Sequence, residues 1–199
     1  MKLGIIIGSH RKNSESSRVG EYISQKFKAD SFNIIDLGKL SLPIWDEEII
    51  KSEEWKNEFW EPISEKLKEC QGIIIITPEY NGMVSPALKN FFLFTKPIEI
   101  GHKPALIISV SSGNGGAYPI SELRMSSYKN TRICYIPEHI IIRKVETCLK
   151  SEAPENENDK FVREKIDFNI ELLKVYSEAM LTIRSNPIID YRKYPNGMS

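Results

Sequence analysis

The loop at residues 8–17, Gly-Ser-His-Arg-Lys-Asn-Ser-Glu-Ser-Ser, concentrates polar side chains between an apolar run and an amphipathic helical pattern. It holds four serines, one arginine and one lysine. Hydroxyls, a guanidinium and the backbone N–H groups at a helix start are the donors that a phosphate requires. The loop lacks the Gly-x-Gly-x-x-Gly pattern of dinucleotide sites and the Gly-Lys-Ser/Thr ending of nucleotide P-loops. A turn capped by Ser14 or Ser16 explains the same residues, so spacing alone leaves both interpretations open.

Two further loops carry residues that suit a planar ligand. Residues 77–86 read Thr-Pro-Glu-Tyr-Asn-Gly-Met-Val-Ser-Pro, and the ring of Tyr80 is able to lie against a flat ring system. Residues 111–117 read Ser-Ser-Gly-Asn-Gly-Gly-Ala, and their glycines let the backbone approach a ligand closely. Asn-Gly is also a strong turn signal. Each loop taken alone is therefore explained equally well as an ordinary turn.

The elements that position these loops follow from hydrophobic patterning. Continuous apolar runs at residues 3–7, 72–77 and 104–110 are typical of strands covered on both faces of a parallel sheet. A weaker run at 32–37 predicts a further strand. Segments 132–135 and 139–143, separated by Pro137, predict the fifth. Helical spacing is found between the runs, at residues 17–27, 53–70 (with Pro62 expected to interrupt or kink it), 86–94, 116–129 and 159–183.

This alternation of strands and helices predicts an α/β fold with a three-layer, doubly wound sheet of five parallel strands in the order 2-1-3-4-5. We expect one domain at residues 1–185 and a C-terminal tail at 186–199. Residues 40–50 are predicted to form a loop over the rim of the sheet. Ligands bind beyond the carboxyl ends of the strands in such sheets, so the loops at 8–17, 77–86 and 111–117 should converge.

Composition excludes several classes of partner. Lys and Arg total 27, as do Asp and Glu, so no overall charge attracts nucleic acid or an anionic membrane. Three cysteines without paired spacing argue against a disulfide framework, and no apolar run is long enough for a membrane span. His102 and His139 lack partners at ligand spacing, so no metal is expected. His10 lies in the first loop and is able to donate to a phosphate, but we expect it to face solvent. We predict a cytoplasmic protein.

The three loops together resemble the NADPH-dependent FMN reductase family, which is flavodoxin-like and includes quinone, azo-dye and chromate reductases. The resemblance rests on Gly8-Ser9-x-Arg11-x-x-Ser14, on Pro78-Glu79-Tyr80-Asn81-Gly82 followed by Leu88-Lys89-Asn90, and on Ser112-Gly113-x-Gly115-Gly116 followed by Leu123-Arg124. It covers residues 1–145 in the same order. The segment from Pro78 to Gly82 with the following Leu-Lys-Asn is its most specific part.

The resemblance implies an NADPH- or NADH-dependent oxidoreductase with bound FMN, a small-molecule electron acceptor and a homodimeric or homotetrameric assembly. No side chain need act as an acid or base, because the cofactor carries the chemistry. The implied cofactor-binding residues form three sets: Ser9, Arg11, Ser14, Ser16 and Ser17 around the phosphate; Pro78, Glu79, Tyr80, Asn81 and Gly82 along the ring and ribityl chain; and Ser112, Gly113 and Gly115 at the pyrimidine edge.

One segment departs from the family pattern. Where the family usually continues with small residues and then Asp and Trp, this chain has Phe-Phe-Leu-Phe at residues 91–94. Four such residues in a row cover every side of a helix, which favours partial burial against another subunit. Two alternatives to an enzyme remain: an electron carrier for a protein partner, and a flavin-free domain that keeps the fold for binding. Carriers of this type are generally strongly acidic, whereas this chain is neutral.

Overall fold

The computed structural model describes residues 1–28 and 30–194. Its strands are β1 (Lys2–Ile7), β2 (Ser31–Asp36), β3 (Gly72–Tyr80), β4 (Met83–Val84), β5 (Pro104–Val110) and β6 (Cys134–Ile142). Its α-helices are α1 (Glu15–Lys26), α2 (Glu47–Lys51), α3 (Glu61–Glu69), α4 (Pro86–Phe94), α5 (Pro97–Ile100), α6 (Ala117–Met125), α7 (Tyr128–Thr131) and α8 (Glu157–Arg184). A π-helical segment (Trp55–Trp60) precedes α3, and a short 3-10 turn (Val145–Thr147) follows β6.

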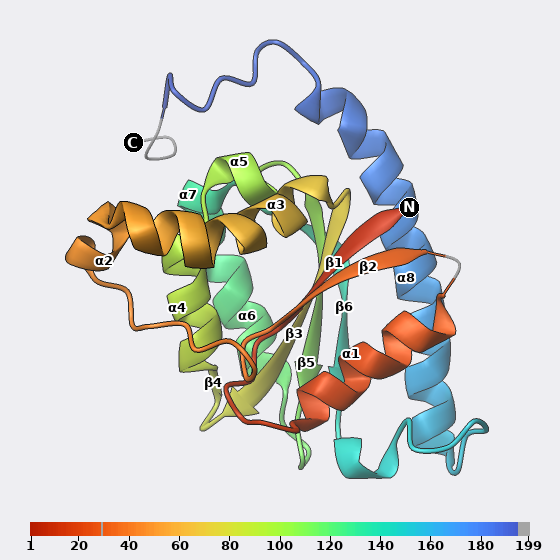
Figure 1. The fold of residues 1–199 in the computed structure, drawn as a ribbon. Coiled ribbons are helices and arrows are strands. Elements are labelled where there is room, and N and C mark those ends of the chain that lie inside the picture. The colour runs from red at the N-terminus through yellow and green to blue at the C-terminus, as the bar shows by residue number, and fades with distance from the viewer. Residues whose placement is uncertain (29, 195–199) are drawn as a thin grey trace.

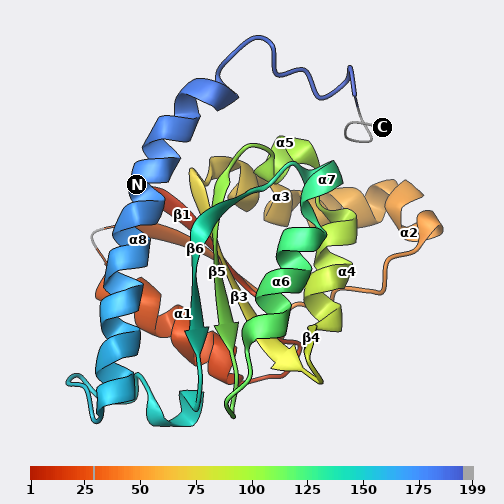
Figure 2. The same cartoon turned by 180° about the vertical axis from the view of Figure 1, so that it is seen from behind.

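These elements form three layers. Helices α1 and α8 cover one face of the sheet, and α3, α4 and α6 cover the other (Figures 1 and 2). The strand order is β2-β1-β3-β5-β6, all parallel, with β4 paired antiparallel to the end of β3. The flavodoxin-like fold and the order of the five parallel strands are thus confirmed, and β4 is an addition that the sequence patterns did not predict.

The centre of the sheet is almost purely isoleucine. In β1 and β3, Ile5 lies beside Ile74 and Ile6 beside Ile75, and β5 continues the row with Ile107 beside Ile75. All of these side chains are fully buried because helices pack on both faces. Continuous rather than alternating hydrophobicity was therefore the correct signal for a parallel sheet covered on both sides.

The last strand corrects the prediction of two segments split by a proline. Strand β6 runs unbroken through Pro137 from Cys134 to Ile142, with an irregularity in its register opposite Ala105 and Ile107. It lies at the end of the strand order, where a residue without an N–H group costs no ladder hydrogen bond on the open side. The proline is therefore accommodated by the edge position and the irregular pairing.

Two predicted boundaries were wrong. The loop predicted at residues 40–50 includes the start of helix α2, whose N-cap is Asp46. The helix predicted at 116–129 is broken between α6 and α7, where Ser127 takes a left-handed conformation with φ of 61°. In the helix predicted at 53–70, the backbone stays helical past Pro62, which lies in the first turn of α3 where a π-helical segment gives way to an α-helix, so the structure shows a change of helix type and no interruption.

The aromatic segment at the end of α4 packs inside this chain, which corrects the expected subunit contact. Phe91, Phe92 and Phe94 are buried, and only Leu93 faces outward, with 62% of its surface exposed. Phe91 and Phe94 contact the ring of Trp60 at centroid distances of 5.7 and 5.6 Å. The extra aromatic volume therefore fills the space between α4 and the segment before α3.

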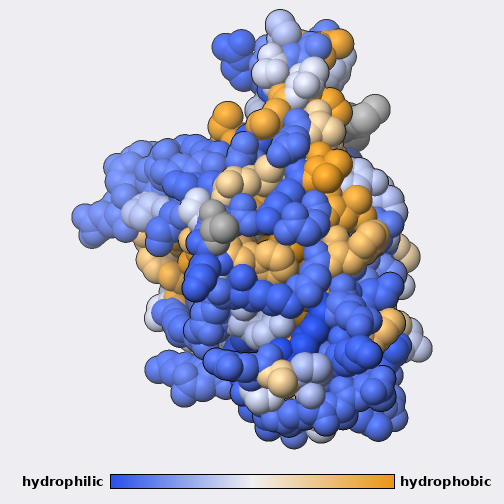
Figure 3. All heavy atoms as spheres, turned by 90° about the vertical axis from the view of Figure 1, so that its right-hand side faces the viewer, coloured by the Kyte–Doolittle hydropathy of each residue, from blue (hydrophilic) through white to orange (hydrophobic). Residues whose placement is uncertain are grey.

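The long helix α8 extends beyond the sheet toward the C-terminus (Figure 1). Figure 3 views this side and shows hydrophobic side chains gathered in its upper half above a hydrophilic lower half. Exposed apolar side chains on α8 are Phe161, Phe168, Val175, Leu181 and Ile183. None of the described helices combines the length and apolar composition needed to cross a bilayer.

The described part of the tail, residues 186–194, returns toward α5 and α7 at the end of the sheet opposite β4 (Figures 1 and 2). The ring of Tyr191 stacks on His102 at a centroid distance of 6.1 Å, and the Arg132 guanidinium lies 5.2 Å from the Tyr191 ring. Residues 195–199 of the predicted tail lie outside the described residues.

A buried lysine near the end of α3 gives a test of the packing. The Nζ atom of Lys103 donates to the carbonyls of Leu67 and Lys68 at 2.5 and 3.0 Å, and its side chain is 2% exposed. Burial, aided by the charge of Arg184, lowers the pKa of Lys103 from 10.5 to about 7. Between these two values the unfolded chain binds the proton more tightly, so the contribution of Lys103 to stability rises with pH.

We therefore expect the difference in free energy of unfolding, wild type minus Lys103→Met, to increase as pH rises from about 7 to about 10. Urea denaturation of both proteins at the two pH values measures this difference. Comparison with the variant cancels the titration of Cys134 and Cys148, whose pKa values are raised by burial and do not depend on Lys103. A difference that does not change with pH would show that Lys103 stays protonated in the folded protein.

Candidate functional site

The three predicted loops meet beyond the carboxyl ends of β1, β3 and β5. The Ser9 hydroxyl lies 3.0 Å from the Tyr80 hydroxyl, which joins the first loop to the second. The Gly116 N–H donates to Glu79 Oε2 at 2.6 Å, which joins the second loop to the third. The Ser85 hydroxyl, at the start of α4, donates to the carbonyl of Gly8. Hydrogen bonds between side chains and backbone thus link all three loops.

The first loop leads into the N-terminus of α1. Asn13 turns the chain with a φ of 54°, a conformation that asparagine tolerates better than most residues. Ser14 is the N-cap, and its Oγ accepts from the Ser17 N–H at 3.1 Å. The first N–H groups of a helix have no acceptor within the helix, so this end of α1 carries partial positive charge toward the loop.

Two groups in this loop lack a hydrogen-bond or ion-pair partner among the described residues. The Oγ atom of Ser16 is buried and has no hydrogen-bond partner in the described structure, and the residue is 1% exposed. Arg11 is exposed, and no hydrogen bond or ion pair ties its guanidinium to another residue among 1–28 and 30–194. A buried hydroxyl without a partner costs free energy unless a ligand or water supplies one. This pairing of an orphaned hydroxyl and an uncommitted guanidinium at a helix start fits a phosphate.

The second loop is a tight hairpin between β3 and β4. Glu79 pairs with Val84 and Tyr80 with Met83, and the two residues between them, Asn81 and Gly82, have φ of 51° and 72°. Two consecutive positive φ values at Asn-Gly are characteristic of a type I′ turn. The turn signal in the sequence was therefore correct, and the turn also directs Tyr80 toward Ser9.

The hairpin is fixed to α6 by Glu122. One oxygen of this carboxylate accepts from the Val84 N–H at 2.7 Å, and the other pairs with Lys89. Partial burial raises the pKa of Glu122, but the bonds from Lys89 and Val84 outweigh burial and hold it below the usual value. Glu122 of α6 therefore holds the hairpin through Val84, and its ion pair with Lys89 connects it to α4.

A cavity of about 560 Å³ opens where the first and second loops meet. It is lined by His10, Arg11, Glu79, Tyr80, Asn81, Met83, Val84 and Pro86. His10, which was expected to face solvent rather than phosphate, is exposed and touches the edge of the Tyr80 ring at a centroid distance of 5.3 Å. The lining combines polar and basic groups with the apolar Met83, Val84 and Pro86, a mixture typical of small-molecule sites.

The third loop, residues 111–117, has its glycine backbone exposed in part. Its end is held by the bond from the Gly116 N–H to Glu79. Ser112 and Gly113 are exposed, and no heavy atom lies within 4 Å of the position that a Cβ at Gly113 would take. At Gly115 a Cβ would lie 2.1 Å from Glu79 Oε2, so a side chain at this position would displace the carboxylate that accepts from the Gly116 N–H. Neither Ser112 nor Gly113 lines the cavity described above.

Met83 and Ser85 lie in the predicted second loop but were not singled out as site residues, and Asp36 was not identified as part of this region. Met83 lines the cavity, Ser85 ties α4 to Gly8, and Asp36 accepts from Ser17 Oγ at 3.0 Å. Asp36 is the last residue of β2, so its position at the carboxyl end of a strand beside the first loop was the available signal.

Glu79 gives a test of the link between the second and third loops. Glu79→Ala leaves the Gly116 N–H without its acceptor, which should lower the free energy of unfolding by about 1–3 kcal/mol and speed amide exchange at Gly116. Glu79→Gln is the matched control, because its amide oxygen accepts the same bond. Urea denaturation and hydrogen exchange detected by NMR measure both effects. Equal exchange at Gly116 in the wild type and the alanine variant would contradict the link.

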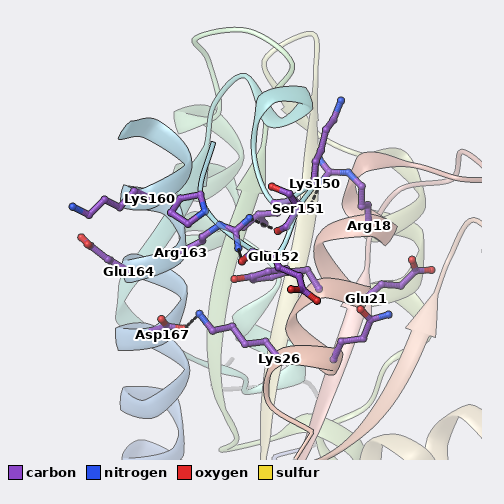
Figure 4. Close-up of a pocket in the computed structure, with 14 residues that line it drawn as sticks. Arg18, Glu21, Lys26, Lys150, Ser151, Glu152, Lys160, Arg163, Glu164 and Asp167 are labelled. Carbon is purple, nitrogen blue, oxygen red and sulfur yellow. Dashed lines mark hydrogen bonds and ion pairs between the residues drawn. The ribbon is translucent and has the colours of Figure 1, made fainter. Parts of the chain in front are cut away.

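A larger cavity, of about 950 Å³, lies elsewhere, between α1, α8 and residues 149–154. In Figure 4 Lys26 of α1 reaches Asp167 of α8, and Arg163 turns toward Ser151 and Glu152. Arg163 is further held by Asp159, at 3.0 Å. None of the predicted site residues lines this cavity. Its charged groups bind one another, so we interpret them as contacts that hold α1 against α8 and not as a ligand site.

Comparison with known proteins identifies the family of this chain. The profile of a family described as NADPH-dependent FMN reductase matches residues 1–147. An NADPH azoreductase from Bacillus sp. (strain OY1-2) is 27% identical over 142 residues, which cover 71% of this chain and 76% of that protein. A quinone reductase from Pseudomonas putida is 27% identical over 127 residues, which cover 58% of this chain and 63% of that protein.

Solved structures show the same fold. FerB, a flavoenzyme NAD(P)H:(acceptor) oxidoreductase from Paracoccus denitrificans, superimposes with a TM-score of 0.70 at 18% identity, covering 91% of this chain and 97% of that one. At this identity the likeness establishes the fold alone. The profile match, in contrast, spans all three loops and most of the sheet. The chain therefore belongs to the NADPH-dependent FMN reductase family of flavodoxin-like oxidoreductases.

Proposed function

We propose that this chain binds FMN with its phosphate in the loop at residues 9–17 and acts as an NAD(P)H oxidoreductase on small-molecule acceptors. The observation that carries the proposal is the buried Ser16 hydroxyl, which lacks a partner in the first turn of α1, in the same loop as the uncommitted Arg11 side chain. A phosphate satisfies both groups at once. The family match of residues 1–147 makes FMN the ligand that the loop is expected to hold.

The residues present fit each part of FMN. Ser9, Ser16, Arg11 and the first N–H groups of α1 would hold the phosphate. Tyr80 and the hairpin turn would lie along the ring and ribityl chain, and the backbone of residues 112–116 would approach the pyrimidine edge. When bound, FMN supplies the chemistry by carrying two electrons from a reduced nicotinamide to an acceptor. The protein's part is to orient the cofactor and to offset the phosphate charge.

Small aromatic or quinoid compounds are the proposed acceptors. Relatives at 27% identity are named as azo and quinone reductases, and the exposed Met83 and Asn81 leave an open approach to the cavity. Either NADPH or NADH is proposed as the donor, since relatives of both kinds are named. No observation favours the electron carrier, whose protein partner would need a charged docking face.

We further propose a cytoplasmic homodimer or homotetramer. Exposed apolar side chains support an assembly, namely Met83 and Tyr118 near the site, Leu93 and Met125 at the far ends of α4 and α6, and Phe168 and Val175 on α8. Light scattering coupled to gel filtration of the purified protein measures the assembly directly. A monomer at all concentrations would contradict this part of the proposal alone.

The activity is tested by adding NADPH to the FMN-loaded protein under anaerobic conditions. Loss of the oxidised flavin absorbance without any second protein is the expected result, followed by its return when a quinone is added. An electron carrier would keep its absorbance, because it needs a separate reductase. Protein that takes up no FMN would remove both flavin functions.

A further inference from the structure

The turn that follows β2, residues 36–38, lies directly beneath the first loop. The Asp36 carboxylate reaches the start of α1 through Ser17, at 3.0 Å from its Oγ. Gly38 reaches the loop itself, because a Cβ at this position would lie 2.5 Å from the Arg11 carbonyl oxygen and 3.2 Å from that of Ser9. The turn thus contacts the first loop on both sides of Asn13. Gly38 lies against Ser9 and Arg11, and Asp36 accepts from Ser17.

The hydrogen bonds between Ser14, Ser17 and Asp36 run in one direction. An ionised carboxylate only accepts, so the single hydroxyl proton of Ser17 is donated to Asp36 Oδ2. The hydroxyls of Ser14 and Ser17 lie 3.0 Å apart, and Ser17 has no second proton, so Ser14 donates to Ser17. Ser14 Oγ then accepts from the Ser17 N–H as the helix cap. Neither hydroxyl has a proton left for a phosphate.

The proton count differs for the other two serines of the loop. Ser16 Oγ has no partner among the described residues. Ser9 Oγ accepts from the Arg11 N–H at 3.2 Å and, when the Tyr80 hydroxyl donates to it, keeps its own proton free. Ser9 and Ser16 are therefore the hydroxyls that are able to donate to an anion, while Ser14 and Ser17 form a relay to Asp36.

Asparagine is unable to replace Asp36 in this role. Oδ2 accepts from Ser17 and Oδ1 accepts from the Gly38 N–H at 3.0 Å, so both oxygens are used as acceptors. An amide would place an N–H donor against one of these two donors. The carboxylate is 8% exposed, which limits the water available to replace a lost partner.

From these contacts we infer that Asp36 and Gly38 are positioning residues for the phosphate of FMN, with Ser14 and Ser17 serving as their relay rather than as phosphate ligands. The inference rests on the proposed function. Asp36 orients the first turn of α1. The absence of a Cβ at Gly38 lets the Arg11 and Ser9 carbonyls lie close to this turn. Together they hold the Ser16 hydroxyl and the helix N–H groups where a phosphate is able to meet them.

The test compares FMN with riboflavin, which lacks the phosphate, by quenching of flavin fluorescence with the wild type and with Asp36→Asn and Gly38→Ala. Each variant should lose about tenfold or more in FMN affinity, the scale of one misplaced charged hydrogen bond, with little change for riboflavin. Asp159→Asn is the matched control, since Asp159 is also buried and accepts from two backbone N–H groups, those of Leu149 and Glu155. A variant that loses only stability should lower both affinities alike.

The outcomes separate the inference from the proposed function. An FMN-to-riboflavin affinity ratio that stays at the wild-type value in either variant overturns the positioning role. If Asp36→Asn fails to fold, Ser17→Ala breaks the same relay and should lower the ratio in the same way. A wild type that shows no preference for FMN over riboflavin removes the proposed phosphate site itself, whatever the variants do.

Discussion

Replacing Arg11 with alanine is expected to weaken FMN binding by about 1.5–3 kcal/mol, roughly tenfold to 150-fold, the usual contribution of a hydrogen bond to a charged group. The side chain is exposed, so its removal breaks no hydrogen bond or ion pair among the described residues. Folding stability should therefore stay within about 0.5 kcal/mol of the wild type. Isothermal titration with FMN and urea denaturation measure the two quantities.

Lys12→Ala is the matched control for Arg11, because it removes a neighbouring exposed cation from the same loop. If Arg11 contacts the phosphate, the control should change FMN affinity by only about twofold, the size of a screened surface charge effect. Equal losses in the two variants would mean that the loop attracts the anion through its overall charge alone. An unchanged affinity in Arg11→Ala would remove this residue from the site.

Phe91→Ala should produce the largest loss of stability, about 3–5 kcal/mol in the free energy of unfolding. Phe91 is fully buried and contacts both Trp60 and Phe92, so truncation leaves a cavity between α4 and the segment before α3. Urea denaturation measures the loss. A small effect on stability combined with a change in subunit assembly would restore the interpretation of this segment as a subunit contact.

Leu93→Ala tests the opposite side of the same helix. Its side chain is 62% exposed, so the free energy of unfolding should change by about 0.5 kcal/mol or less. Comparing its assembly state with that of the wild type by light scattering shows whether this exposed residue takes part in a subunit contact. The pair therefore separates core packing from association within one turn of α4.

The sheet could be predicted because each central strand carries its own signal. The isoleucine runs of β1, β3 and β5 are continuous, and the helices between them dictate parallel pairing and the observed order. The environment of residues 91–94 had no such signal. Four hydrophobic residues in a row fit a core and an interface equally well, and the deciding contact, Trp60, is distant in sequence.

The candidate site shows the same division between local and distant information. The cap at Ser14 and the turn at Asn81 and Gly82 follow from local sequence preferences, and both are present. The partners Glu79 and Gly116, 37 residues apart, and Ser17 and Asp36, 19 apart, are brought together only by the sheet. Residue type and spacing thus indicated the groups of the phosphate loop but not which hydroxyls are free to donate.

The most direct test of the central claim is an NMR titration of the isotope-labelled protein with FMN. If FMN binds where the three loops meet, the largest amide shift changes will fall within residues 9–17, 79–82 and 112–116. Amides that line the cavity between α1 and α8, such as those of Lys150 and Glu164, should move little. Shift changes concentrated at that second cavity, or none at saturating FMN, would contradict the account.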